Sequence, residues 1–145
     1  MPPKAVEKQS SRVLDKVEIN ILSGKILDAA IEVHRTLGPG LLESVYEECL
    51  YYELRTKEIN VERQCPISIV YKGQKLNKEF IIDLFAENEI IIELKTVDKL
   101  LPIHEAQLLT YLKLAGKKLG LLINFNDTLL KDGYKRLLNG KLPEL

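Results

Sequence analysis

Two carboxylates and one ammonium group are the residues of this sequence whose types and spacing best fit chemistry. Glu93 lies in the nearly continuous apolar run of residues 89–95. An unpaired carboxylate in such a strand would cost several kcal/mol or shift its pKa until it is neutral, so something must compensate it. Lys95 follows two residues later, and the two-residue period of a β-strand puts both side chains on the same face.

A second carboxylate is expected beside this pair. The chain turns at Glu87-Asn88, and a hairpin across that turn places Asp83 opposite Ile92 or Glu93. Two carboxylates and a lysine then share one patch, which suits a hard divalent cation. Such a set fits metal-assisted phosphodiester hydrolysis, where the metal acidifies water and the lysine orients that water or stabilises negative charge. A plain salt-bridge cluster is the alternative interpretation.

The elements that must position these residues follow from hydrophobic periodicity. Residues 19–37 and 42–54 each predict an amphipathic helix, separated by Gly38-Pro39-Gly40. Strands are predicted over residues 67–71, 75–85, 89–95 and 119–125, and a helix follows Pro102 and ends near Gly116. Residues 126–145 fit either a capped helix or two short extended pieces, with the extended interpretation favoured. The order predicts one mixed α/β domain.

Length and composition agree with a single domain of this kind. The chain has 145 residues, and we predict a polar N-terminal arm over residues 1–18 and one folded domain over residues 19–145. A net charge of zero argues against a dedicated high-affinity nucleic-acid or membrane-surface binder, although lysines group locally, as at Lys72, Lys75 and Lys78. Cys49 and Cys65 are expected to be buried, reduced thiols. No apolar run approaches a membrane span, so a cytoplasmic location is the default expectation.

The spacing of the charged residues resembles a known signature. Ile82-Asp83, nine residues, and then Glu93-Leu94-Lys95 resemble the motif of the PD-(D/E)xK nuclease superfamily, with Ile82 in place of the proline. Residues 40–46 resemble the G-x-x-E-x-x-Y motif of the GxxExxY protein family. The resemblance covers about residues 26–139 and implies an α/β fold, a PD-(D/E)xK nuclease-like αβββαβ core with an extra N-terminal helix.

The resemblance also implies roles for particular residues. Asp83 and Glu93 would be metal ligands, with the Leu94 carbonyl as a third, and Lys95 would be the catalytic lysine. Glu43 would be the upstream helix acid of many superfamily members, although a solvated glutamate on an acidic helix is the alternative.

Three further side chains are candidates at the rim of the site. Tyr46 is either a core aromatic, which is the more common case, or a substrate contact. Gln107 and Tyr111 resemble the Q-x-x-x-Y element of the exonuclease branch, and would hold the catalytic lysine or a phosphate unless they form only a polar helix edge. His104 lies on nearly the same face, and the sequence does not decide its role.

The resulting expectation is a nuclease that uses Mg²⁺ (or Mn²⁺) to hydrolyse DNA or RNA without sequence specificity. The alternative is a non-catalytic assembly or nucleic-acid-binding module that retains the nuclease fold. We also expect a homo-oligomer in which residues 1–18 lie against a neighbouring subunit, because polar tails rarely order unaided.

Overall fold

The computed structural model describes residues 13–144. Its elements are, in chain order, α1 (Lys16–Leu37), α2 (Glu43–Thr56), β1 (Val61–Tyr71), β2 (Gln74–Ala86), β3 (Ile90–Lys95), α3 (Pro102–Ala115), β4 (Leu119–Asn124), the 3-10 helix η1 (Leu130–Gly133) and β5 (Tyr134–Leu138). This order confirms the predicted α/β class with an extra N-terminal helix. The ambiguous C-terminal segment contains one short helical turn and one strand, so the extended interpretation is the better one.

Within residues 13–144 five strands form one sheet in the order β1-β2-β3-β4-β5. Neighbouring strands are antiparallel except β3 and β4, which are parallel and are joined through α3. β3 therefore lies at the centre, and every residue of it except Lys95 is buried. This agrees with its nearly continuous run of β-branched residues, which is typical of a strand covered on both faces.

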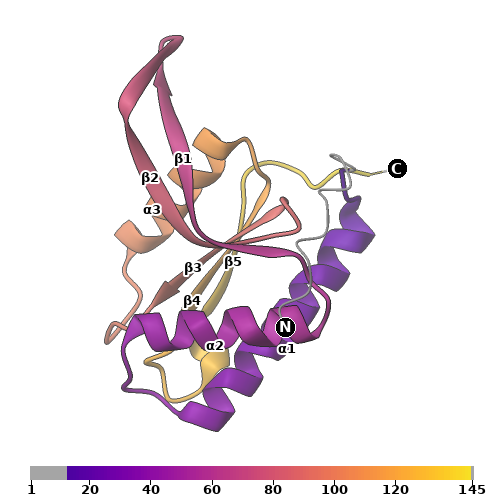
Figure 1. Cartoon of the computed structure of the whole chain (residues 1–145), viewed down its shortest axis with the longest axis vertical. Helices are drawn as coiled ribbons and strands as arrows, with labels where there is room; N and C mark the ends of the chain where they lie inside the picture. The colour runs from indigo at the N-terminus through magenta and orange to yellow at the C-terminus, as the bar shows by residue number, and fades with distance from the viewer. Residues whose placement is uncertain (1–12, 145) are drawn as a thin grey trace.

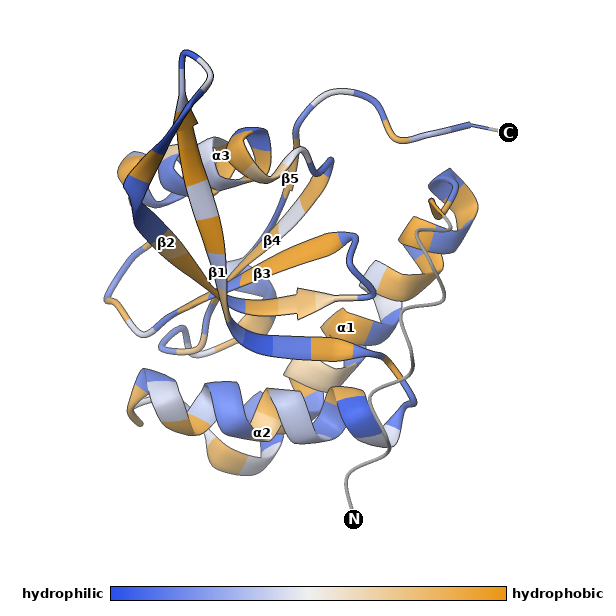
Figure 2. Ribbon diagram, turned by 45° about the horizontal axis from the view of Figure 1, so that its top comes forward, coloured by the Kyte–Doolittle hydropathy of each residue, from blue (hydrophilic) through white to orange (hydrophobic). Residues whose placement is uncertain are grey.

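The two faces of the sheet are covered by different helices (Figure 2), with α3 on one side and α1 and α2 on the other. The odd-numbered Ile91 packs in the core on the α3 side, whereas Ile92 and Leu94 pack in the core beneath α1 and α2. Glu93 and Lys95 alternate with these residues and therefore belong to the α3 face. Within residues 13–144 neither Cys49 nor Cys65 forms a disulfide, and both are half-buried rather than buried.

The first helix begins before the predicted domain boundary at Ile19. Asp15 caps α1 by accepting the Glu18 N–H at 2.9 Å, and the Glu18 carboxylate accepts the Asp15 N–H at 3.2 Å. The Lys16 N–H donates to the Pro143 carbonyl at 2.7 Å, which ties the helix to the C-terminal segment. Residues 1–12 of the predicted N-terminal arm lie outside the described residues. Every helix in the described part of the chain is too short or too polar to cross a membrane.

The hairpin of β1 and β2 extends well beyond the rest of the sheet (Figure 1). β2 pairs with β1 from Ala86 to Gln74, but its register with β3 covers only Ala86 to Leu84. The two strands therefore separate from β3 near Asp83. We call the outer part of this hairpin, residues 70–79, the hairpin arm; all of its residues are exposed.

Candidate metal and catalytic site

Asp83 and Glu93 meet where β2 separates from β3. The pairs Leu84–Ile92, Phe85–Ile91 and Ala86–Ile90 continue to Asp83 opposite Glu93, which is the second of the two predicted registers. The Asp83 N–H donates to Glu93 Oε1 at 3.2 Å, and the Leu94 N–H donates to Asp83 Oδ2 at 2.8 Å. Each carboxylate thus satisfies a backbone N–H that the separating strands no longer pair with each other.

The Glu93 carboxyl is strongly perturbed by this position. Burial, which is the largest cause, and the neighbouring Asp83 charge together raise its pKa to about 9, although the Asp83 N–H and Lys95 oppose the shift. At neutral pH and without a bound cation, Glu93 therefore carries its proton. This is the neutralisation expected for a carboxylate in an apolar strand.

Lys95 is half-buried at the end of β3, two residues after Glu93. Its charge lowers the pKa of Glu93 and also that of Glu43, so the ammonium group is within electrostatic reach of both carboxyls. The Lys95 carbonyl accepts the Phe125 N–H at 2.9 Å, which fixes the backbone of the lysine against β4.

Asn124, the polar residue at the end of β4, forms hydrogen bonds with the backbone just after Lys95. Asn124 is fully buried, its side-chain oxygen accepts the Val97 N–H at 3.0 Å, and its amide donates to the Val97 carbonyl at 2.8 Å and to the Asp127 carboxylate at 2.9 Å. Sequence reasoning did not select Asn124. The signal that selected Glu93, a polar side chain in an apolar strand, is equally present at Asn124.

Glu43 is the first residue of α2, and the structure brings it to the carboxylate pair. Burial raises the pKa of its carboxyl, and the Asp83 charge raises it further. Gly40 precedes it at φ +98°, a left-handed conformation that favours glycine and lets the chain reverse between α1 and α2.

Tyr46 lies in the hydrophobic core, which is the more common of the two sequence interpretations. Its side chain is fully buried and its ring stacks on Phe125 with 4.6 Å between centroids. Its hydroxyl donates to the Gly38 carbonyl at 2.5 Å and accepts the Leu41 N–H at 3.1 Å. Tyr46 therefore fastens the loop that leads into Glu43.

A buried carboxylate one turn after Glu43 was missed by sequence reasoning. Glu47 accepts a hydrogen bond from Gln64 Nε2 at 2.5 Å and forms a salt bridge with Arg63 at 3.2 Å. Gln64 has φ +48° and lies in β1 between the residues that pair with Leu84 and Ile82, next to Asp83. Glu47 is one of several glutamates on α2, so nothing in the sequence distinguishes it.

Helix α3 brings one of its three candidate side chains to the carboxylates. Burial raises the pKa of the Tyr111 phenol, and the charges of Glu93 and Asp83 raise it further, so the phenol stays protonated near them. Gln107 lies one turn earlier and is exposed. His104 has a structural role, because its Nδ1 accepts the Leu101 N–H at 2.9 Å at the start of α3.

The oxygen atoms of Asp83 and Glu93 suit one hard cation that is bound by few side chains. No group of three or more His, Cys, Asp or Glu side chains within residues 13–144 is arranged to hold a metal ion. Asp83 and Glu93 each accept one backbone N–H, and a side-chain hydrogen bond joins the two carboxyls, so a cation would take the place of the proton between them. Two carboxylates and a backbone carbonyl are the oxygen ligands that Mg²⁺ accepts together with water.

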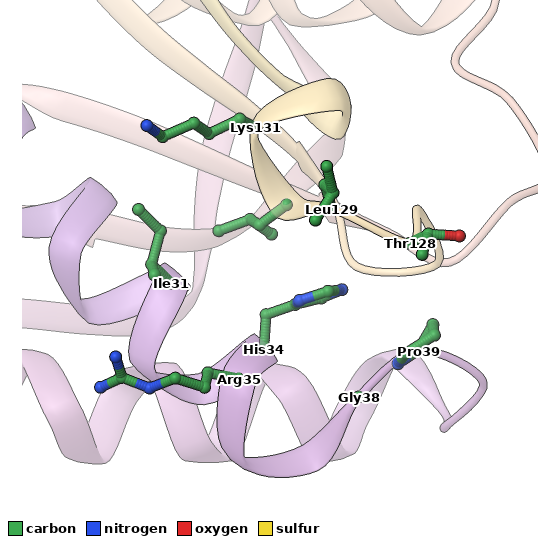
Figure 3. Close-up of a pocket in the computed structure, with 9 residues that line it drawn as sticks. Ile31, His34, Arg35, Gly38, Pro39, Thr128, Leu129 and Lys131 are labelled. Atoms are coloured by element: carbon green, nitrogen blue, oxygen red, sulfur yellow. The ribbon is translucent and has the colours of Figure 1, made fainter.

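A separate pocket of about 460 Å³ lies between α1, the α1–α2 loop and η1 (Figure 3). None of the candidate site residues lines it. His34 at its wall has Nε2 2.8 Å from the Asp127 carbonyl, so this ring nitrogen is used by the backbone.

The family model of the PD-(D/E)XK nuclease superfamily matches residues 20–137. The match covers most of the chain and includes Glu43, Asp83, Glu93, Lys95 and Tyr111. The chain therefore belongs to the PD-(D/E)XK nuclease superfamily, and a nuclease-like function follows in general terms. No curated protein matches the chain significantly, and no solved structure does.

Proposed function

We propose that this protein is a metal-dependent nuclease that hydrolyses phosphodiester bonds of DNA or RNA. The main observation behind the proposal is that Asp83, Glu93 and Lys95 lie together where β2 separates from β3, a place we call the fork. Membership of the nuclease superfamily supports it, and nucleases of this superfamily generally use divalent metals.

Asp83, Glu93 and the Leu94 carbonyl would hold Mg²⁺ or Mn²⁺. Bound there, the ion would supply Lewis-acid chemistry, neutralising charge on a phosphate and acidifying water. The fit is supported by the cost of the pair without a cation, since two adjacent desolvated carboxylates repel each other and Glu93 is held in its protonated form. Cation binding and loss of that proton are therefore linked.

The other residues act through charge and hydrogen bonding. Lys95 orients the attacking water or stabilises negative charge developing on the phosphate. Tyr111 keeps its phenolic proton and donates a hydrogen bond to a phosphate oxygen, with the exposed Gln107 one turn away as a second contact. Glu43 supplies a carboxyl at the opposite rim, beside Asp83 and Lys95.

Membership of the GxxExxY protein family is a further part of this proposal. The three defining residues of that motif have distinct roles, since Gly40 reverses the chain, Glu43 reaches the carboxylate pair, and Tyr46 fastens the loop between them. These roles give a physical reason for that spacing, because residues three apart lie on the same face of a helix.

The proposed function is tested by cleavage of labelled DNA and RNA with Mg²⁺, Mn²⁺ or EDTA. We expect cleavage by the wild type with either metal, none in EDTA, and none for Asp83→Asn. Exposed Asp98→Asn, in the loop between β3 and α3, is the matched control and should cleave as the wild type does. Failure of the wild type to cleave any of these substrates overturns the proposal.

Metal binding is tested separately by thermal unfolding of wild type and Asp83→Asn. The wild type should gain ~2.7 kcal/mol at a metal concentration one hundred times Kd. Asp83→Asn keeps an oxygen for the Leu94 N–H and removes a charge beside Glu93, so its metal-free stability should be equal or higher. Equal metal-induced shifts in both proteins contradict the site. The non-catalytic alternative predicts nucleic-acid binding with no metal-induced shift in either protein.

A further inference from the structure

The hairpin arm is a solvent-exposed part of the protein. Residues 70–79 are all exposed, and the hairpin projects from the body of the molecule (Figure 1). Its base is fixed beside the site: Phe80 stacks on Tyr111 with 4.2 Å between ring centroids, and the same strand carries Asp83. The hairpin arm is therefore a two-stranded ribbon anchored at the candidate catalytic residues.

The charge of the hairpin arm is positive in a chain whose net charge is zero. Lys72, Lys75 and Lys78 are opposed within it only by Glu79. The turn and the adjoining part of β2 form a hydrophilic tip (Figure 2). Lys72 lies in the turn itself, with its Nζ 5.4 Å from the centroid of the Tyr71 ring.

The lysines are spread along the turn and the β2 strand of the ribbon. Lys75 pairs with Val70, and Glu79 pairs with Ser68 two residues earlier in β1, so Lys75 and Glu79 share a face. The register of the two strands shifts between these pairs, so Lys78 lies in an irregular part of the ribbon. Because Lys72 lies in the turn, the positive charge extends to the tip of the ribbon, which is the part that enters a groove first.

We propose that the hairpin arm inserts into the major groove of duplex DNA, with Lys72, Lys75 and Lys78 contacting phosphates on both sides of the groove. This inference rests on the proposed nuclease function, and it names duplex DNA as the substrate of that same site. The major groove of B-DNA is about 12 Å wide and admits a two-stranded β-ribbon. Duplex RNA has a deep, narrow major groove, and a single strand has none.

The length of the hairpin arm sets how much DNA it needs. Lys75 pairs with Val70 and Asp83 lies opposite Gln64, so six residues of β1 separate the two positions, which is about 20 Å of extended strand at ~3.3 Å per residue. At ~3.4 Å per base pair this corresponds to about six base pairs on one side of the scissile bond. Because phosphate contacts carry no sequence information, the hairpin arm adds affinity without specificity.

The experiment measures binding in EDTA, so that it needs neither cleavage nor metal. Fluorescence anisotropy of a labelled 24-base-pair duplex compares the full-length wild type with the triple variant Lys72→Gln, Lys75→Gln, Lys78→Gln. The expected loss of affinity is on the order of tenfold or more at low salt, with a salt slope smaller by about 0.9 for each lost phosphate contact. The control changes two exposed lysines of α1 and the exposed lysine just after α2 (Lys16→Gln, Lys25→Gln, Lys57→Gln) and should bind as the wild type does.

Glu79→Gln tests the same surface in the opposite direction. It removes the acid of the hairpin arm and should strengthen binding by roughly two- to threefold. For each variant the far-ultraviolet circular dichroism spectrum and the unfolding curve must match those of the wild type. We expect this match because the changed side chains are exposed.

A series of ligands then tests the geometry. Wild-type affinity should rise with duplex length until about six base pairs lie beyond the site, and the triple variant should lose this dependence. Duplex RNA and single-stranded DNA should bind more weakly and respond less to the triple variant. Equal affinities for wild type and triple variant, or stronger binding of RNA or single strands that is equally sensitive to the lysines, overturn the proposed groove insertion. If DNA binding depends on the hairpin arm but the wild type does not cleave DNA, the proposed nuclease function is overturned and the groove insertion is not.

Discussion

The Asp83 N–H donates to the Glu93 carboxyl, and the Asp83 carboxylate accepts the Leu94 N–H, so the two acids are held side by side across two strands. Glu93 keeps its proton because it is buried and because Asp83 is charged beside it. A divalent cation between the two would favour the ionised form of Glu93 in spite of its burial. The protonation of Glu93 is therefore the most direct residue-level readout of the site.

Glu93→Gln should change how the stability of the metal-free protein depends on pH. In the unfolded chain Glu93 releases its proton near pH 4.5, whereas in the folded protein it keeps the proton until its pKa of about 9. Between these values the unfolded state binds fewer protons, so the wild-type free energy of unfolding falls as pH rises, by at most about 1.4 kcal/mol per pH unit. The variant has no such proton.

Urea unfolding in EDTA from pH 5 to pH 9 measures this difference. The advantage of Glu93→Gln over the wild type should grow with pH across the range. Glu48→Gln, on the exposed face of α2, is the control and should follow the wild type. Parallel curves for Glu93→Gln and wild type would contradict the protonated state.

Lys95→Ala should separate metal binding from catalysis. Loss of one electrostatic stabiliser at the transition state should reduce turnover on the order of a hundredfold or more, while the metal-induced rise in melting temperature remains. Lys95→Arg should not restore activity, because the guanidinium is larger, planar and never deprotonated. Full activity of Lys95→Arg would show that Lys95 is only an ion-pair partner.

At the scale of elements, the loop between α1 and α2 decides where Glu43 lies. Tyr46 is the link, since its hydroxyl bonds both the Gly38 carbonyl and the Leu41 N–H from inside the core. Glu47 makes a second link from α2 to the bend of β1 at Gln64. The two links hold the start of α2 against the fork that carries Asp83.

Tyr46→Phe should therefore lower the free energy of unfolding. It should also weaken catalysis, although the side chain lies in the core. It leaves two backbone groups of the loop without their partner, which costs about 1–3 kcal/mol of unfolding free energy. Tyr52→Phe, whose side chain is 65% exposed, should have no measurable effect. Urea unfolding and the cleavage assay check both variants, and equal stabilities for the two would refute the role given to Tyr46.

At the scale of the whole molecule, α1 leaves an apolar stripe exposed at its start. Val17 and Ile21, one turn apart at the start of α1, are 65% and 55% exposed, and Val13 just before the helix is 64% exposed. Side chains four apart lie on the same face of a helix, and such a face favours contact with another subunit. This stripe adjoins the predicted N-terminal arm and supports the proposed homo-oligomer.

Light scattering of the full-length protein should give a mass above the 16.5 kDa of one chain. Val17→Glu with Ile21→Glu should reduce the mass to that of the monomer, and removal of residues 1–12 should weaken assembly. Glu48→Lys, an exposed charge change on α2, should leave the mass unaltered. A monomeric wild type, or an oligomer indifferent to both changes, rejects this interface.

The meeting of Asp83, Glu93 and Lys95 could be predicted from the sequence because it depends on local rules alone. A tight turn at Glu87-Asn88 sets the register, and the two-residue period of a strand sets the face. The order of helices and strands follows from periodicity for the same reason.

The positions of Glu43 and Tyr111 beside the carboxylates could not be predicted from the sequence. They depend on how α2 and α3 pack on opposite sides of one sheet. The burial of Tyr46, the partners of Glu47 and the hydrogen bonds of Asn124 also arise between segments far apart in the chain. The raised pKa of Glu93 belongs to the same group: its sequence context suggested neutralisation, but the actual burial and the neighbouring Asp83 charge exist only in the folded chain. Periodicity describes one element at a time, whereas a site made of several elements is decided by their packing.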